Sequence, residues 1–182
     1  MLDDEQLIKG MAVAVERNCA SVCIKPYFVG IAAKLLDGTG IRTGTVVGFP
    51  HGSGTVQLKI DEAKQAVDDG ADEIDMVINI GWVKDRKWKE LAEEIAGVKA
   101  ACLGRPLKVI IETCLLSDME KIKLCQVVAK AEAAYLKTST GFSTGGATRE
   151  DVALFARHIG SGVKIKACLL YTSPSPRDMR RS

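Results

Sequence analysis

The chain alternates short apolar, β-branched runs with longer segments in which apolar residues recur at helical spacing. Six runs predict strands, and a helical pattern follows each except the last: residues 20–25, 43–49, 73–79, 107–112, 135–140 and 163–167. The first predicted element is a helix over residues 3–18, with no strand before it. Ser117 and Glu120 form a capping-box pattern, and Gly70 and Gly160 lie where helices should end. Repeated strand–helix units predict an α/β fold with a parallel sheet, open or closed.

Charged residues occur inside these predicted strands, where packing alone would favour apolar ones. Since strand side chains alternate between two faces, the polar residues can be sorted by position. The residues that align within their strands are Glu73, Asp75, Lys108, Glu112, Lys137, Lys164 and Lys166. A buried charge is costly unless it is paired, so the set is either an ion-pair network or a catalytic site. Neighbouring lysines would lower each other's pKa, which favours a neutral amine and Schiff-base chemistry.

A turn rich in Gly, Ser and Thr follows the predicted strand that carries Lys137. Residues 139–148 precede a predicted helix N-terminus, where free backbone N–H groups favour an anion such as a phosphorylated substrate. Such turns are also common as plain loops. No GxGxxG pattern follows a first strand, so a dinucleotide site has little support.

Length and charge narrow the class of protein. A chain of 182 residues fits one domain, and its net charge of +2 equals that of residues 168–182, which hold three arginines and one aspartate. The rest is neutral, so no basic face indicates nucleic acid. No run of 18 apolar residues occurs and the N-terminus is acidic, which favours a soluble cytoplasmic protein without a membrane partner.

The cysteines and histidines do not suggest a metal site. Six cysteines without a CxxC pair, together with two histidines, give no familiar zinc spacing and predict reduced, buried thiols. Cys23 is therefore expected to be a core thiol rather than a reactive one. His51 could act as an acid or base, but no orienting partner is evident, so a structural role is expected.

Four motifs carry a family resemblance. They are GFPHG at residues 48–52, ADEIDMV at 71–77, LKVIIET at 107–113 and LKTSTGF at 136–142. Together they resemble deoxyribose-phosphate aldolase, a class I aldolase with a TIM (β/α)8 barrel. The resemblance extends from about residue 3 to Ala167.

The resemblance implies a role for several residues. Lys137 would form the Schiff base with 2-deoxy-D-ribose 5-phosphate, Lys166 would lower its pKa and assist proton transfer, and Asp75 would relay protons through water. Lys164 is the second choice for either lysine role. The turn around Thr140 and Gly141 would contact the phosphate. The products would be D-glyceraldehyde 3-phosphate and acetaldehyde, formed reversibly in deoxyribonucleoside and carbohydrate catabolism, without metal or cofactor. The family also suggests self-association into a homo-oligomer.

The chain departs from the family pattern at both ends. The resemblance implies that barrel strands 1 and 8 are missing, which leaves a partial barrel over residues 1–167 and a non-native or disordered tail over residues 168–182. Open sheet edges and lost burial predict an unstable, inactive chain. The alternatives are an inactive fragment, another class I or transaldolase-like aldolase, and a non-catalytic barrel that binds sugar phosphates.

Overall fold

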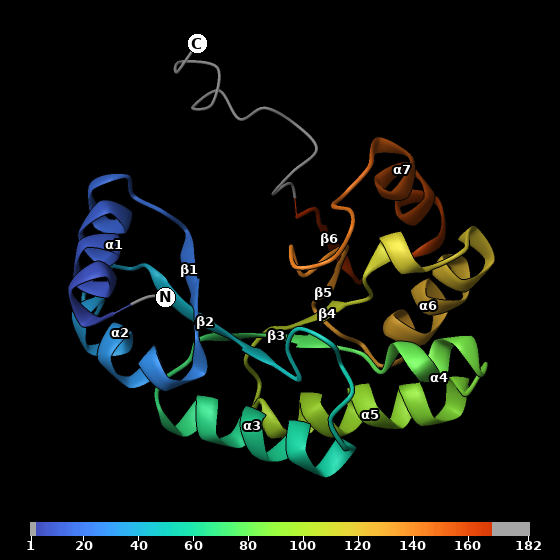
Figure 1. Cartoon of the computed structure of the whole chain (residues 1–182), viewed down its shortest axis with the longest axis horizontal. Coiled ribbons are helices and arrows are strands. Elements are labelled where there is room, and N and C mark those ends of the chain that lie inside the picture. The colour runs from blue at the N-terminus through green and yellow to red at the C-terminus, as the bar shows by residue number, and fades with distance from the viewer. Residues whose placement is uncertain (1–2, 169–182) are drawn as a thin grey trace.

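A computed structural model describes residues 3–168, in which six parallel strands form one curled sheet (Figure 1). Each strand pairs with the next along the chain, in the order β1-β2-β3-β4-β5-β6. The strands are β1 Ser21–Ile24, β2 Arg42–Val47, β3 Glu73–Val77, β4 Leu107–Ile110, β5 Tyr135–Lys137 and β6 Lys164–Lys166. Each lies within or overlaps one predicted run. The predicted α/β fold with a parallel sheet is thus confirmed, in the form of an open, partial barrel.

Helices connect successive strands and start at the signals that the sequence shows. They are α1 Asp4–Glu16, α2 Val29–Leu35, α3 Val56–Asp68, α4 Ile80–Lys84, α5 Trp88–Ala101, α6 Asp118–Lys130 and α7 Arg149–His158. Two short 3-10 turns, Pro26–Phe28 and Thr113–Leu115, follow β1 and β4. Ser117 and Glu120 cap α6 reciprocally, as predicted. Gly70 and Gly160 have φ of 100° and 77°, a conformation that glycine adopts without a Cβ clash.

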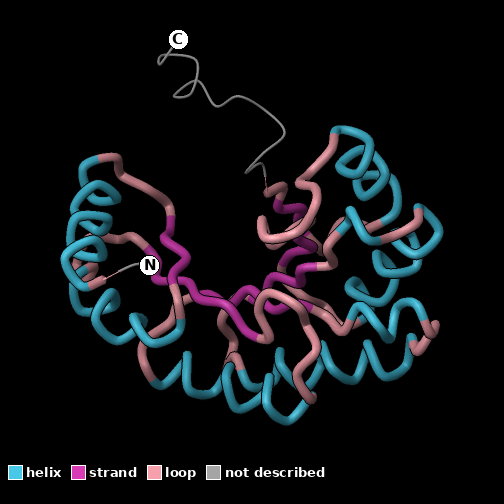
Figure 2. Tube along the Cα trace, viewed as in Figure 1, coloured by secondary structure: helices cyan, strands magenta, loops and turns pink. Residues whose placement is uncertain are grey.

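The helices lie on the convex side of the sheet, and the strands line its concave side (Figure 2). Alternate residues of β3 point to the convex, helix-covered face and to the concave face of the sheet. Ile74 and Met76 belong to the main apolar cluster with residues of α3, α5 and α6, whereas Asp75 points to the other face. All five residues of β3 are buried. The strand therefore has an apolar outer face against the helices and a charged inner face.

A second buried charge cluster ties the convex layer to the ends of β2 and β3. The Lys59 ammonium of α3 lies 2.6 Å from Glu94 of α5 and donates to the carbonyl oxygens of Gly52 and Val77 at 2.7 and 2.9 Å. Glu94 also accepts from the Asn79 N–H at 3.0 Å. Both charged side chains are fully buried. Burial lowers the pKa of Lys59 and raises that of Glu94, in each case against the attraction of the partner.

Residues 169–182 lie outside the described residues, so the predicted division at 167/168 stays a prediction. Within residues 3–168, β1 and β6 each pair with a single strand. None of the helices in this part of the chain has the length and hydropathy needed to cross a membrane.

Removing one partner of the buried Lys59–Glu94 pair should reduce the stability of the fold much more than removing one partner of an exposed ion pair. Lys59→Met should lower the free energy of unfolding by about 3–5 kcal/mol, because it leaves a buried carboxylate without its cation. Lys9→Met is the matched control, since Lys9 pairs with Glu5 at 72% and 77% side-chain exposure; it should cost less than about 1 kcal/mol. Urea unfolding would measure both, and equal losses would contradict the assigned role of the buried pair.

Candidate active site

One carboxylate on the concave face of the sheet contacts three lysine amines. Asp75 Oδ2 lies 2.6 Å from Lys137 Nζ and 3.2 Å from Lys166 Nζ, and Asp75 Oδ1 lies 2.9 Å from Lys108 Nζ. Asp75 is completely buried, and Lys108 is nearly so. Lys137 retains 8% of its side-chain exposure and Lys166 retains 34%. The cluster is thus sealed on the β3 side and accessible from the β6 side.

Strand register explains how residues from four strands meet. Asp75 pairs across the sheet with Lys108, and Lys137 pairs with Lys166. These side chains lie on one face because their strands are parallel and in phase. The β4–β5 register sets Ile110 opposite Lys137, so Lys137 lies nearer the carboxyl end of the sheet than Lys108 does. Carboxyl ends of parallel strands are where α/β barrels carry their active sites.

The lysines control the ionisation of Asp75. Burial alone would raise the pKa of this carboxyl group, but the positive charges of Lys137, Lys108 and Lys166 outweigh burial and hold the pKa below its ordinary value of 3.8. Asp75 is therefore ionised near neutral pH. It can accept hydrogen bonds from amines but does not retain a proton there.

Lys108 contacts both carboxylates of β3. Its ammonium lies 2.5 Å from Glu73 and 2.9 Å from Asp75. The strand alternation placed Lys108 on the charged face but indicated no role for it. In the structure it neutralises the inner end of the cluster, while Lys137 and Lys166 share the outer oxygen of Asp75.

Three other candidates lie apart from this contact. Lys164 is exposed, with its ammonium 5.7 Å from the centre of the Tyr135 ring, and no ion pair joins it to Asp75 within residues 3–168. His51 is exposed in the loop after β2. The expected burial of Cys23 is wrong, since its position on the edge strand β1 leaves it exposed.

The environment does not activate Cys23. Although part of the Cys23 side chain is exposed, neighbouring protein atoms partly desolvate its thiol; this desolvation and the charge of Asp75 raise the pKa of the thiol, and the neighbouring lysines only partly oppose the rise. The general expectation of buried cysteines holds for Cys102 and Cys125 and fails for Cys23 and Cys114, while all six thiols are free.

The turn after β5 is anchored by its own polar groups. The Thr140 hydroxyl and N–H both donate to Glu112, and the hydroxyl oxygen accepts from the Phe142 N–H at 3.0 Å. Thr140 is 5% exposed, and Gly141 has φ of 85°. The polar groups of Thr140 are therefore engaged with protein atoms, and phosphate contact by Thr140 and Gly141 stays a prediction.

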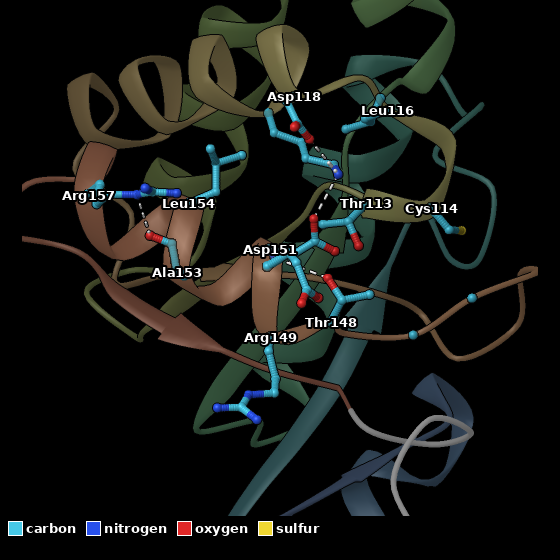
Figure 3. A pocket seen from close by; sticks show the side chains of 14 residues that line it. Thr113, Cys114, Leu116, Asp118, Thr148, Arg149, Asp151, Ala153, Leu154 and Arg157 are labelled. Atoms are coloured by element: carbon cyan, nitrogen blue, oxygen red, sulfur yellow. Dashed lines mark hydrogen bonds and ion pairs between the residues drawn. The ribbon is translucent and has the colours of Figure 1, made fainter.

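A cavity of about 900 Å³ lies between α6 and α7, beside the loops that follow β4 and β5 (Figure 3). Its lining includes Thr113, Cys114, Gly145 and Arg149. Lys121 of this lining pairs with Asp118 and Asp151, at 3.2 and 2.7 Å. The cavity contains none of the four residues of the Asp75 contact. In the described part of the chain, no group of three His, Cys, Asp or Glu is placed to hold a metal ion.

A parallel α/β barrel segment with a buried lysine–carboxylate cluster on its concave face has the architecture of an α/β-barrel enzyme. The description "DeoC/LacD family aldolase" matches residues 1–168, and the chain belongs to this family. Its members are lyases of the aldolase type.

Curated relatives and solved structures agree with this membership. The chain is 47% identical to the deoxyribose-phosphate aldolase of Clostridium tetani over 165 residues, which is 90% of this chain and 76% of that protein. It is 50% identical to the Clostridium perfringens deoxyribose-phosphate aldolase over 155 residues, 85% of this chain and 69% of that protein. A tetrameric deoxyribose phosphate aldolase from Aeropyrum pernix superposes with a TM-score of 0.83 at 27% identity, covering 91% of this chain and 70% of that one.

Removing the shared carboxylate should be costly. Asp75→Asn should lower the free energy of unfolding by about 3–5 kcal/mol, because three ammonium groups lose their common anion. Asp61→Asn is the control, since Asp61 forms an exposed pair with Lys64 and should change stability by less than about 1 kcal/mol. Thermal and urea unfolding would test the difference; an Asp75→Asn variant as stable as the wild type would refute the hub role of Asp75.

The depressed pKa of Asp75 predicts the pH dependence of that loss. A carboxyl group whose pKa is lower in the folded state stabilises the fold above its ordinary pKa of 3.8 and loses this effect as pH falls through the lower, folded value. The stability difference between wild type and Asp75→Asn should therefore be constant above about pH 5 and shrink below about pH 4. A difference that stays constant down to about pH 2 would contradict the assignment.

Proposed function

We propose that the chain cleaves 2-deoxy-D-ribose 5-phosphate reversibly to D-glyceraldehyde 3-phosphate and acetaldehyde, through a Schiff base on Lys137. The observation that carries the proposal is the contact of the Lys137 and Lys166 amines with the same oxygen of Asp75. Family membership and the names of the two clostridial relatives support the choice of substrate.

The first half of the reaction builds the imine. Once the Lys137 ammonium has given a proton to Asp75, its Nζ attacks the C1 carbonyl carbon of the open-chain sugar, and a proton moves from the nitrogen to the carbonyl oxygen to give a carbinolamine. The hydroxyl group takes up the proton that Asp75 accepted and leaves as water, which gives an iminium ion. Asp75, 2.6 Å from Lys137 Nζ, is placed to accept the proton that the amine releases. Because its pKa is low, Asp75 passes this proton on rather than holding it.

The second half breaks the carbon chain. A two-carbon and a three-carbon product require cleavage of the C2–C3 bond. The C3 hydroxyl gives its proton to Asp75 through water, the bonding electrons of C2–C3 move toward the iminium nitrogen, and D-glyceraldehyde 3-phosphate leaves. The remaining enamine takes that proton back at C2, and hydrolysis by water then releases acetaldehyde and free Lys137. Lys166 is the neighbouring ammonium in this scheme, and its 34% side-chain exposure gives it contact with solvent for proton exchange.

We propose a substrate partner, a metabolic process and an oligomeric state together with this activity. A sugar phosphate is the small-molecule partner, and breakdown of deoxyribonucleosides in the cytoplasm is the process in which it would arise. The tetrameric Aeropyrum pernix relative supports a homo-oligomer.

Borohydride trapping tests the Schiff base without requiring full turnover. Incubation with acetaldehyde or 2-deoxyribose 5-phosphate followed by sodium borohydride should give a reduced adduct, and peptide mass mapping should place it on Lys137. Lys137→Arg should abolish the adduct, because a guanidinium stays protonated and does not form the imine. Lys164→Arg is the matched control, since Lys164 makes no ion pair with Asp75 within residues 3–168, and it should leave labelling intact.

Labelling that persists in the Lys137→Arg variant, or labelling of no lysine in the wild type, would disprove the proposal. Labelling of Lys137 by acetaldehyde but not by the sugar phosphate would support Schiff-base formation on Lys137 and contradict 2-deoxyribose 5-phosphate as the substrate.

A further inference from the structure

Glu112 has an unusual backbone conformation at the carboxyl end of β4. Its φ and ψ are 53° and 68°, in the left-handed region that disfavours residues with a Cβ. Conformations of this kind persist where surrounding contacts determine them, and they cluster at functional sites. The contacts of the carboxylate show what holds Glu112 in place.

The Glu112 carboxylate is buried and bound mainly by one residue. Glu112 is 3% exposed; the Thr140 N–H lies 3.3 Å from each carboxylate oxygen, and the Thr140 hydroxyl donates to Oε2. The Cys114 thiol adds a long contact of 4.0 Å. Among residues 3–168, no Lys, Arg or His pairs with this carboxylate. The buried Glu112 carboxylate therefore depends on the position of Thr140 for most of its hydrogen bonds.

This contact lies within the pairing of the β4 and β5 segments. The N–H of Ile111 donates to the Lys137 carbonyl at 3.1 Å, and that of Thr113 to the Thr138 carbonyl at 2.9 Å. Glu112 lies between these two bonds and reaches over to Thr140, three residues beyond Lys137. The backbone that carries the Schiff-base lysine and the turn that follows it are thus held by adjacent residues of one segment.

Thr140 transmits the position of Glu112 to the rest of the turn. Its hydroxyl donates to Glu112 and so presents its oxygen to the Phe142 N–H, 3.0 Å away. The exposed Phe142 ring then meets the Phe49 ring edge-on, with centroids 5.4 Å apart. Farther along, a Cβ on Gly145 would lie 3.1 Å from the Cys114 Cβ, so the turn also packs on the segment after Glu112. Moving Glu112 would displace residues 140–145.

We infer that Glu112 is a positioning residue that holds the turn over residues 140–145 ready for the anionic end of the substrate, and so sets a preference for phosphorylated over unphosphorylated sugars. The inference rests on the proposed function. The polar groups of Thr140 are engaged with Glu112 and Phe142, and the Phe142 N–H is engaged with Thr140, so the phosphate would meet the other backbone N–H groups of the turn, beginning with that of Gly141. Glu112 acts through Thr140 and does not touch the substrate.

Imine trapping with two sugars tests the inference. The concentration that gives half-maximal reduced adduct on Lys137 is measured for 2-deoxyribose 5-phosphate and for 2-deoxyribose. Glu112→Gln keeps the size of the side chain but replaces one acceptor oxygen with a donor and removes the charge. It should raise the half-maximal concentration of the phosphorylated sugar about tenfold, the effect of losing a hydrogen bond to a charged group. The value for 2-deoxyribose should change less than about twofold, as expected away from the altered contact.

Two further variants distinguish the loss of turn positioning from a general loss of folding. Glu132→Gln is the matched control, because Glu132, which precedes β5, also has a left-handed backbone, with φ of 52°. Its side chain is 82% exposed and forms an ion pair with Lys99 of α5. It should leave both sugars unaffected. Glu112→Gly removes the carboxylate together with the backbone strain, so it should fold and show the same selective loss as Glu112→Gln.

Equal losses for both sugars, or wild-type behaviour of Glu112→Gln or Glu112→Gly, would overturn the positioning role. If acetaldehyde and both sugars fail to label Lys137 in the wild type, the proposed function itself fails and this inference fails with it. Labelling by acetaldehyde together with an unchanged preference between the sugars would reject only the role of Glu112.

Discussion

The shared carboxylate of Asp75 is the interaction on which the rest of the site depends. Two carboxylates and three amines meet on the concave face, so the cluster holds one more amine than it has anions: Glu73 and Asp75 against Lys108, Lys137 and Lys166. Lys108 takes contacts from both carboxylates, which leaves Lys137 and Lys166 to share a single oxygen. Charge compensation is therefore least complete at these two amines.

The apolar layer behind the sheet keeps this arrangement fixed. Ile74 and Met76 alternate with Asp75 along β3 and pack against the helices, so the strand cannot shift by one residue without exposing apolar groups and burying charge on the wrong face. Lys59 and Glu94 fix the carboxyl end of β3 through Val77 and Asn79. Packing on one face and buried ion pairs at the strand end therefore specify the same position for Asp75.

Much of the fold and part of the site could be predicted from the sequence. Alternation of six β-branched runs with helical segments identified each of the six strands of residues 3–168, because apolar spacing differs between strands and helices. Strand alternation also placed Asp75, Lys108 and Lys137 on one face. It could not distinguish Lys164 from Lys166, because both have the same parity and only the register with β5 sets Lys166 beside Lys137.

Two features could not be predicted from the hydrophobic pattern: contacts between helices that are far apart in the sequence, and irregular backbone conformations. Lys59 and Glu94 are separated by 35 residues and occur in amphipathic helices, where a charged residue normally indicates a solvent-exposed face. Glu112 continued the alternation of its predicted run, but the strand ends at Ile110 and the left-handed turn at Glu112 redirects its side chain to Thr140. Cys23 was expected in the core because an apolar neighbourhood in sequence does not reveal that a strand lies at a sheet edge.

The most direct test of the account is a crystal structure of the chain after reduction with acetaldehyde and sodium borohydride. We expect an ethyl group on Lys137 Nζ, with the Asp75 carboxylate within hydrogen-bond distance of that nitrogen and Lys166 unmodified beside it. An ethyl group on Lys108 or Lys166 with Lys137 unmodified, or a modified Lys137 turned away from Asp75, would contradict it.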